Sequence, residues 1–347
     1  TKNAPDKWPV LRRDMGVRMS RPYVAILRAK QGELGAVKSL ADEVKPFVRP
    51  LFELTPPPIQ TKTVPGADGR NIRVKVPKDV AAHLADLASA INDASYGLTE
   101  VWVDDRTHRP STLPATGQHP LTHFFSFLKS PSCPVIPVVG LHRDPGYMKA
   151  ALEQASSAGS VVIRLQARDL AEARGARLRV NDVLERAGLK PSQAHLLLDI
   201  EPLSPGHIDL VLMGISGVLA NIPSPDQWRT FTVATTALPD KPYGSVPNDS
   251  HALFERACWS MWKALQTVRV PRLPGFGDYG IDNPNTDLDR EFYNQPVPMI
   301  RYTTLDHWAF FRGTGKPKGG GKRKTDWPDL AKRLIDSGLY RGKDFSA

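Results

Sequence analysis

The chain has 347 residues, 41% of them hydrophobic, with 46 lysines and arginines against 36 acidic residues, a formal net charge of +10. This apolar content is ample for a packed core. No apolar run approaches the ~20 residues of a membrane-spanning helix, and the basic first twenty residues lack the apolar centre of a signal peptide, so we expect a cytoplasmic protein with no membrane partner. Cys133 and Cys258 stand far apart and form neither a disulfide framework nor a zinc-ligand spacing.

Short apolar runs alternate with helical patterns through the first half of the chain. Three predicted strands, each followed by apolar residues at helical spacing, are Tyr23–Leu27, Phe47–Leu54 and Glu100–Asp104. Residues 55–76 interrupt this order with three consecutive prolines at 56–58, an Asp-Gly turn signal and an alternating segment, Ile72–Val76. We therefore predict a hairpin inserted after the second strand.

The same alternation continues in the second half of the chain. The next predicted strands are Val135–Leu141, Val161–Gln166, Ala194–Pro202 and Trp228–Thr236. A helix is predicted to begin near Asp249 or Ser250, and the Gly- and Pro-rich residues 269–296 are predicted to be loop. The segments Pro298–Thr303 and His307–Arg312 are predicted to form an eighth strand or a hairpin, followed by a last helix over Asp326–Ser337.

Eight strand–helix alternations predict an α/β fold, a single (β/α)₈ TIM-barrel-like domain over residues 21–347. The alternative is an open, doubly wound parallel sheet, since Pro137 weakens the fourth strand and the eighth is ambiguous. Residues 1–20 are predicted to be a flexible basic arm. Residues 55–76, 269–296 and the Gly/Lys segment 313–324 are predicted to be excursions from the barrel.

Six segments carry a resemblance to a known family: Tyr23–Glu33 (YVAILRAKQGE), Pro50–Pro57 (PLFELTPP), Leu196–Ile200 (LLLDI), Phe276–Ile281 (FGDYGI), Ile300–Thr303 (IRYT) and Trp308–Gly313 (WAFFRG). In this order they resemble the Beta protein family of bacteria and phages, from about residue 22 to the end. The resemblance implies a phage or phage-defence context, and it supplies no catalytic residues. The N-terminal arm and residues 313–324 depart from the family pattern.

Polar residues stand at the ends of most predicted strands, and in a barrel these ends converge on one mouth. The candidate catalytic residues are Glu53, Asp104, Asp199 and Glu201, and the candidate ligand-binding residues are Lys30, Gln31, Arg164, Asp278, Tyr279 and Arg301. Gln166 and Thr235 also stand at strand ends. Asp199 and Glu201 are two positions apart on one strand, so they are predicted to point the same way. Such carboxylates suit a divalent metal ion, acid–base chemistry, or ion pairs among themselves.

Two motifs resemble nucleotide sites without meeting their requirements. Gly275–Gly280 has the spacing G-x-G-x-x-G, but its surroundings predict a loop, whereas a dinucleotide site needs a strand before it and a helix after it. The glycines and lysines of residues 313–322 lack the order of a Walker phosphate loop. His119 and His123 stand one helical turn apart, but no glutamate follows the first, so a metalloprotease is not supported.

The net positive charge is confined to two segments. Residues 1–22 contribute +4 and residues 312–324 contribute +6, which leaves the rest of the chain neutral. The candidate nucleic-acid-binding residues are therefore Lys316, Lys318, Lys322, Arg323 and Lys324, which are expected to contact phosphates without reading bases. The alternative is a solvated linker.

Three functions follow as hypotheses, and whether the protein is an enzyme stays open. The first is a barrel that binds a phosphate-bearing ligand, nucleic acid or nucleotide, at its C-terminal mouth. The second is a non-catalytic assembly or recognition subunit with a protein partner in a phage or defence complex. The third is a metal-dependent phosphodiester hydrolase, which adds a divalent metal ion as cofactor.

Overall fold

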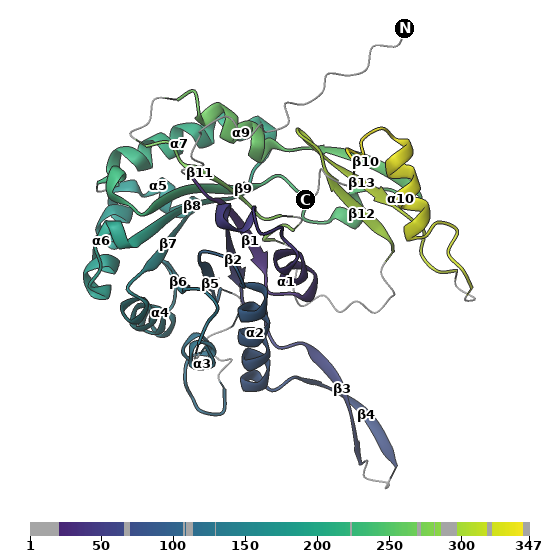
Figure 1. Cartoon of the computed structure of the whole chain (residues 1–347), viewed down its shortest axis with the longest axis horizontal. Coiled ribbons are helices and arrows are strands. Elements are labelled where there is room, and N and C mark those ends of the chain that lie inside the picture. The colour runs from purple at the N-terminus through teal and green to yellow at the C-terminus, as the bar shows by residue number, and fades with distance from the viewer. Residues whose placement is uncertain are drawn as a thin grey trace.

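A computed structural model of the chain describes residues 21–65, 70–106, 108, 114–128, 130–222, 224–268, 272–280, 282–285, 297–317 and 321–342. Its centre is a closed barrel of eight parallel strands in the order β1-β11-β9-β8-β7-β6-β5-β2. Helices surround this barrel (Figure 1). The prediction of a TIM-barrel-like α/β fold is therefore confirmed, and the open sheet is not observed.

The barrel strands are β1 (Tyr23–Arg28), β2 (Val48–Glu53), β5 (Val101–Asp104), β6 (Val135–Gly140), β7 (Val161–Gln166), β8 (Ala194–Pro202), β9 (Thr230–Thr236) and β11 (Gly275–Asp278). The helices around them are α1 (Gln31–Lys38), α2 (Val80–Ala94), α3 (Pro120–Ser126), α4 (Pro145–Ala158), α5 (Ala167–Ala171), α6 (Ala173–Ala187), α7 (Ile208–Asn221), α8 (Pro242–Ser245) and α9 (Ala257–Leu265). The outward strand faces and the helices share one large apolar core.

Alternate residues of each strand face the barrel axis. A smaller apolar cluster, which includes Val24, Leu51, Trp102 and Leu197, fills the middle of the barrel. Three strands show the same inward order of a polar residue, an apolar residue and an acid: Arg49-Leu51-Glu53 in β2, Glu100-Trp102-Asp104 at β5, where Glu100 directly precedes the strand, and His195-Leu197-Asp199 in β8. Polar layers thus close both ends of an apolar centre.

The eighth barrel strand is not the one that the sequence predicts. It is β11, inside the segment predicted to be loop, and it pairs with β1 and β9. Its glycines allow the strands to approach closely: a Cβ on Gly277 would lie 2.9 Å from the Cβ of Ala234 and 3.0 Å from the carbonyl oxygen of Val24. The G-x-G-x-x-G spacing therefore serves barrel closure, and residues 282–285, the described residues that follow it directly, form no helix.

A second sheet lies beside the barrel (Figure 1). It consists of β10 (Ser250–Glu255), β13 (His307–Arg312) and β12 (Met299–Thr303), paired antiparallel in that order. Helix α10 (Trp327–Asp336) packs on it through Leu330 and Leu334. The helix predicted to begin near Ser250 is therefore wrong over β10, where side chains alternate between half-buried and exposed, and α9 begins only at Ala257.

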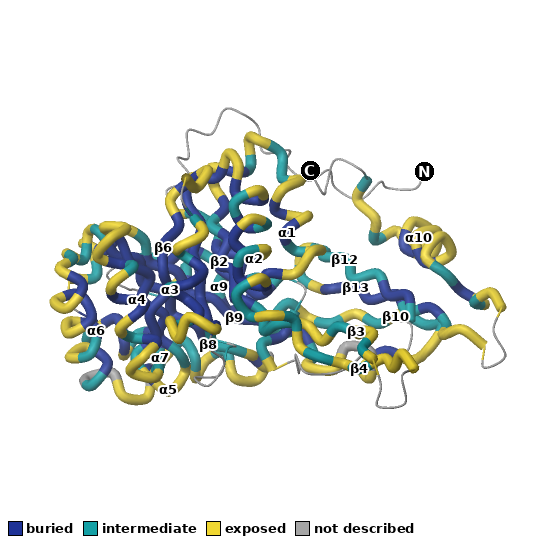
Figure 2. Tube along the Cα trace, turned by 90° about the horizontal axis from the view of Figure 1, so that it is seen from below, coloured by how far each residue is buried: buried dark blue, intermediate teal, exposed yellow. Residues whose placement is uncertain are grey.

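The predicted insertion contains a hairpin of β3 (Ile59–Pro65) and β4 (Asn71–Pro77). It projects away from the barrel, and its residues are mostly exposed, in contrast to the buried barrel strands (Figure 2). None of the described helices combines the length and the hydrophobicity that crossing a bilayer requires.

Candidate functional site at the barrel mouth

Arg164 lies at the centre of a buried ionic cluster at the C-terminal end of the barrel. The side chain is fully buried. Its Nη1 donates to Glu53 Oε1 at 2.8 Å and to Asp104 Oδ2 at 2.7 Å, and its Nε and Nη2 donate to Asp199 Oδ2 at 2.9 and 2.7 Å. One guanidinium from β7 thus joins acids from β2, β5 and β8. The structure brings together three of the four predicted catalytic carboxylates, around an arginine.

Two tyrosines complete this Arg164 cluster. Tyr279 donates to Asp199 Oδ2 at 2.6 Å and accepts from Arg164 Nη2 at 2.9 Å. The single hydroxyl proton of Tyr147, from α4, is shared between the carbonyl oxygen of Val138 at 2.5 Å and Asp104 Oδ1 at 3.1 Å. Burial and the adjacent acids raise the pKa of both tyrosines well above the ordinary value, so both stay protonated as donors.

Charge pairing fixes the protonation states at the centre of the cluster. Burial alone would raise the pKa of Asp104, but Arg143 and Arg164 hold it below its ordinary value. Burial alone would lower the pKa of Arg164, but Asp199, Tyr279 and the other acids raise it well above its ordinary value. Asp104 and Arg164 are therefore held in their charged forms at the centre of the cluster.

Two further arginines stand between this cluster and solvent. Arg143 donates through Nη2 to both oxygens of Asp104 at 2.9 and 2.8 Å, and its buried Nε has no partner among the described residues. Gly140 makes room for it, because a Cβ there would lie 2.8 Å from that Nε. Arg106 is 22% exposed, and its closest acids are distant, Glu53 Oε1 at 3.4 Å and Glu201 Oε1 at 3.8 Å.

Glu201 lies beside the cluster on an irregular part of β8. The strand register shifts between Asp199 and Pro202, and Glu201 has a φ of 62°. Its side chain accepts from Gln166 Nε2 at 2.8 Å, and its backbone N–H donates to Asp199 Oδ1 at 3.1 Å. The simple alternation that predicted a common direction for Asp199 and Glu201 ends at this bulge.

A titratable acid occupies the rim of the mouth. Glu33, on α1, accepts from the backbone N–H of Arg28 at 3.2 Å, and its other oxygen is buried without a partner among the described residues. Burial, helped by the charge of Asp282, raises the pKa of Glu33 to about 7. Arg28 in turn pairs with Asp282 at 3.1 Å. Glu33 is the described group of this rim best suited to exchange protons near neutral pH.

The remaining predicted residues are placed differently. Lys30 and Gln31 are exposed at the start of α1, and the hydroxyl of Thr235 donates to the carbonyl oxygen of Glu201 at 2.6 Å. Asp278 faces the outer side of the barrel wall, although its neighbour Tyr279 faces inward. Arg301 lies outside the barrel on β12, 5.5 Å above the ring of Phe310, so the prediction that it shares the mouth cavity is wrong.

The basic segment 313–324 is closed at its base, where the N–H of Thr314 donates to the carbonyl oxygen of Thr325. Lys324 pairs with Asp249 at 3.2 Å, and Arg323 is 3.9 Å from Asp326. Lys316 and Lys322 are exposed, and Lys318 lies outside the described residues. Local acids thus offset part of the charge that the sequence assigned to this segment.

The N-terminal end of the barrel holds a second buried cluster, centred on Glu100. This carboxylate is 2% exposed and lies 3.3 Å from Arg49 Nε and 3.0 Å from Arg229 Nη2. His195 Nε2 is 3.5 Å away, and its Nδ1 is 2.8 Å from the hydroxyl of Thr230. Burial, together with the two arginines, lowers the pKa of His195 to about 3, so the imidazole is neutral despite its acidic neighbour.

Arginine and tyrosine side chains already donate to four carboxylate oxygens at the mouth, which are Glu53 Oε1, Asp104 Oδ1 and Oδ2, and Asp199 Oδ2. Within the described ranges, no group of three His, Cys, Asp or Glu side chains is arranged to hold a metal ion. The geometry therefore fits anion contact by arginines at the surface of the cluster better than metal ligation by the acids.

Sequence reasoning missed three candidate positions at the mouth: Arg106, Arg143 and Glu33. Arg106 and Arg143 follow β5 and β6 by two and three residues and reach back over the strand ends. A search that includes the first residues of each loop would have found both arginines. Glu33 stands on a helix, and its raised pKa depends on burial that no local pattern reveals.

The chain was compared with known proteins. The model of a family described as Beta protein matches residues 23–347, nearly the whole chain. No curated protein matches it.

Proposed function

The chain belongs to the Beta protein family, and we propose that its barrel binds a phosphate-bearing ligand, a nucleotide or a nucleic-acid end, at the C-terminal mouth. The observation that carries the proposal is the position of Arg106 and Arg143. Both guanidinium groups lie at the solvent side of the Arg164 cluster, and both have donor capacity left beyond their contacts with acids. Arginine suits phosphate because its planar fork matches two phosphate oxygens.

The buried acids have a supporting role in this proposal. Asp104 holds Arg143 through two hydrogen bonds, and Glu53 lies 3.4 Å from Arg106. Such pairing fixes the arginines before a ligand arrives, which reduces the entropy lost on binding. Because both oxygens of Asp104 and one oxygen of Glu53 already accept hydrogen bonds from arginines, we favour binding over metal-dependent phosphodiester hydrolysis. We include in this proposal that the protein encounters its ligand in a phage or phage-defence context.

Calorimetric titration at low salt tests this proposal, with pyrophosphate, ATP, GTP and a 5′-phosphorylated single-stranded oligonucleotide as probes. We expect at least one probe to bind, and Arg106→Gln to weaken its affinity about tenfold or more, since a hydrogen bond between charged groups contributes ~1.5–3 kcal/mol. Arg143→Gln should act in the same direction.

The matched control is Arg186→Gln, which removes a guanidinium 49% exposed on α6 and paired with Asp182. It should bind as the unaltered protein does. If no probe binds, or if Arg106→Gln and Arg186→Gln bind alike, the mouth is not a phosphate site.

A second candidate function, the protein-assembly subunit, is favoured by the β3–β4 hairpin. The strand register places Val64, Ile72, Val74 and Val76 on one face, and Ile72 is 47% exposed. An isolated two-stranded hairpin with an uncovered apolar face gains stability from a partner. A photo-crosslinking residue at Ile72 should capture one defined protein in the native cell, whereas the same residue at exposed Leu178 on α6 should not. Equal capture at both positions would exclude this role.

A further inference from the structure

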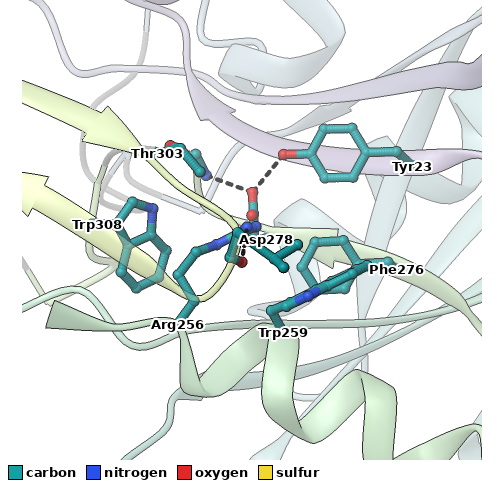
Figure 3. A pocket seen from close by; sticks show the side chains of 9 residues that line it. Tyr23, Arg256, Trp259, Phe276, Asp278, Thr303 and Trp308 are labelled. Atoms are coloured by element: carbon teal, nitrogen blue, oxygen red, sulfur yellow. Dashed lines mark hydrogen bonds between the residues drawn. The ribbon is translucent and has the colours of Figure 1, made fainter. Parts of the chain in front are cut away.

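A cavity of about 400 Å³ lies on the outer wall of the barrel, away from the Arg164 cluster. In the described chain no helix returns from β11 to cover this wall. The start of α9 and the β12–β13 turn cover it incompletely. The cavity is therefore bounded by the barrel on one side and by the antiparallel sheet on the other (Figure 3), and it is lined chiefly by Tyr23, Arg256, Trp259, Phe276, Asp278 and Trp308.

Aromatic rings form most of the cavity wall. Tyr23 and Phe276, on adjacent strands, stack with centroids 5.9 Å apart, and Trp259 meets Phe276 edge-on at 5.4 Å. Trp308 comes from β13. These rings are held by several different elements, so they present fixed π faces at little entropic cost. Such walls suit a flat aromatic ligand, which gains stacking energy against them.

Asp278 is the fixed acceptor in this cavity. It is 6% exposed, and its Oδ1 accepts from the hydroxyl of Tyr23 at 2.5 Å and from the N–H of Gly280 at 2.9 Å. The described residues donate only these two hydrogen bonds to the Asp278 carboxylate, and both go to Oδ1. Oδ2 is therefore available to another donor. Burial raises the pKa of Asp278, although its hydrogen bonds and the charge of Arg256 act against that shift. A ligand that brings an N–H donor would satisfy this acid.

Arg256 supplies a fixed positive group. Its Nη1 donates to the carbonyl oxygens of Thr304 at 3.1 Å and Leu305 at 2.9 Å, while its buried Nε has no partner in the described residues. The guanidinium lies 5.7 Å from the ring centroid of Trp259 and 5.8 Å from that of Trp308. A second cation would be repelled here, so an aromatic cage for an organic cation is disfavoured.

We propose that this outer-wall cavity binds a neutral nitrogen heterocycle of nucleobase type, stacked against the aromatic side chains and donating an N–H to Asp278. The carboxylate takes a ring or amino N–H, and Arg256 faces a ring nitrogen or carbonyl oxygen. The cavity volume lies within the ~300–1,000 Å³ range of small-molecule pockets. The site is separate from the mouth, and no phosphate is needed to occupy it.

Tryptophan fluorescence can test this site, because Trp259 and Trp308 line the cavity and a stacked base quenches indole emission. The probes are adenosine, guanosine, cytidine and uridine, which carry no phosphate and so do not report on the mouth. We expect saturable quenching at up to millimolar concentration. Uridine should bind most weakly, because its base offers only a ring N–H to the carboxylate, whereas the other three bases carry an amino group.

Asp278→Asn should weaken nucleoside binding about tenfold, the effect of one hydrogen bond to a charged group. Trp259→Leu should also weaken nucleoside binding, because it removes an aromatic wall of the cavity, and it tests the proposal if Asp278→Asn fails to fold. Trp327→Phe, at a tryptophan 52% exposed on α10, is the matched control and should leave binding unchanged. Absence of saturable quenching by any nucleoside overturns the proposal. Quenching by choline with none by nucleosides overturns it too, since that result would identify a cation cage.

Discussion

The two ends of the barrel neutralise a buried charge with opposite arrangements of ions. At the C-terminal mouth one arginine is surrounded by three acids and a tyrosine, and at the N-terminal end one glutamate is surrounded by two arginines, an indole N–H and a histidine. The central group is buried at both ends, but Arg49 and Arg229 are 13% and 46% exposed, whereas Asp104 and Asp199 are fully buried. The ends therefore differ in how readily water can replace a lost partner.

Arg164→Met gives the largest effect and separates the ends most clearly. Glu53, Asp104 and Asp199 would lose their shared cation without access to water, so the free energy of unfolding should fall by about 3–5 kcal/mol. Urea denaturation followed by circular dichroism measures this loss. Arg164→Lys should be more stable than Arg164→Met and less stable than the unaltered protein, since an ammonium keeps the charge but lacks the fork that reaches all three acids. A loss for Arg164→Met no larger than for Arg186→Met, at an exposed position, would contradict the central role of Arg164.

Glu100→Gln should have a smaller effect at the opposite end. The variant keeps the shape of the side chain and removes its charge, while water can still solvate Arg229 and part of Arg49. We expect the free energy of unfolding to fall by about 2 kcal/mol, the scale of one hydrogen bond between charged groups. Both variants should be measured under the same denaturation conditions. If Glu100→Gln is more destabilising than Arg164→Met, solvent access does not explain the difference between the ends.

Two titratable groups should give pH dependences of opposite sign. The pKa of His195 is lowered from 6.5 to about 3, so the unfolded chain binds more protons between these values, and this contribution to stability is lost as pH falls. The pKa of Glu33 is raised from 4.5 to about 7, so the folded chain binds more protons, and its contribution is lost as pH rises through 7.

Unfolding free energies measured from pH 4 to 8 for His195→Gln and Glu33→Gln distinguish these two contributions. His195→Gln should flatten the acidic decline, and Glu33→Gln should flatten the decline toward neutral pH. Parallel curves for both variants and the unaltered protein would show that neither group titrates differently on folding.

Local sequence patterns predicted the seven apolar barrel strands, because a strand buried on both faces must be nearly continuous in apolar residues. They failed at β11, whose sequence GFGD has one apolar side chain and becomes a strand only through its pairing with β1 and β9. They failed at β10 because Phe254, Met261 and Leu265 also fit helical spacing. Pairing with β13, which is distant in sequence, selects the strand over the helix at these residues.

The candidate site was predictable where it depends on strand ends. Glu53, Asp104 and Asp199 end apolar strands, and barrel geometry alone brings them together. Arg301 was misplaced because its position depended on which segment is the eighth strand. Asp278 and Tyr279 were assigned to one mouth, and only the inward direction of Tyr279 and the outward direction of Asp278 divide them between two sites.

The closure of the barrel between β1 and β11 also bears on how the protein is made. Tyr23 and Asp278, which hydrogen bond across this seam, are 255 residues apart in the sequence. At synthesis rates of ~5–20 residues per second, the edge of β1 waits roughly 13–50 s for its partner strand to leave the ribosome. An open edge of an apolar parallel strand is a template for intermolecular pairing. The nascent chain is therefore expected to need chaperone protection until β11 emerges, and slow codons between α9 and β11 would lengthen that exposure.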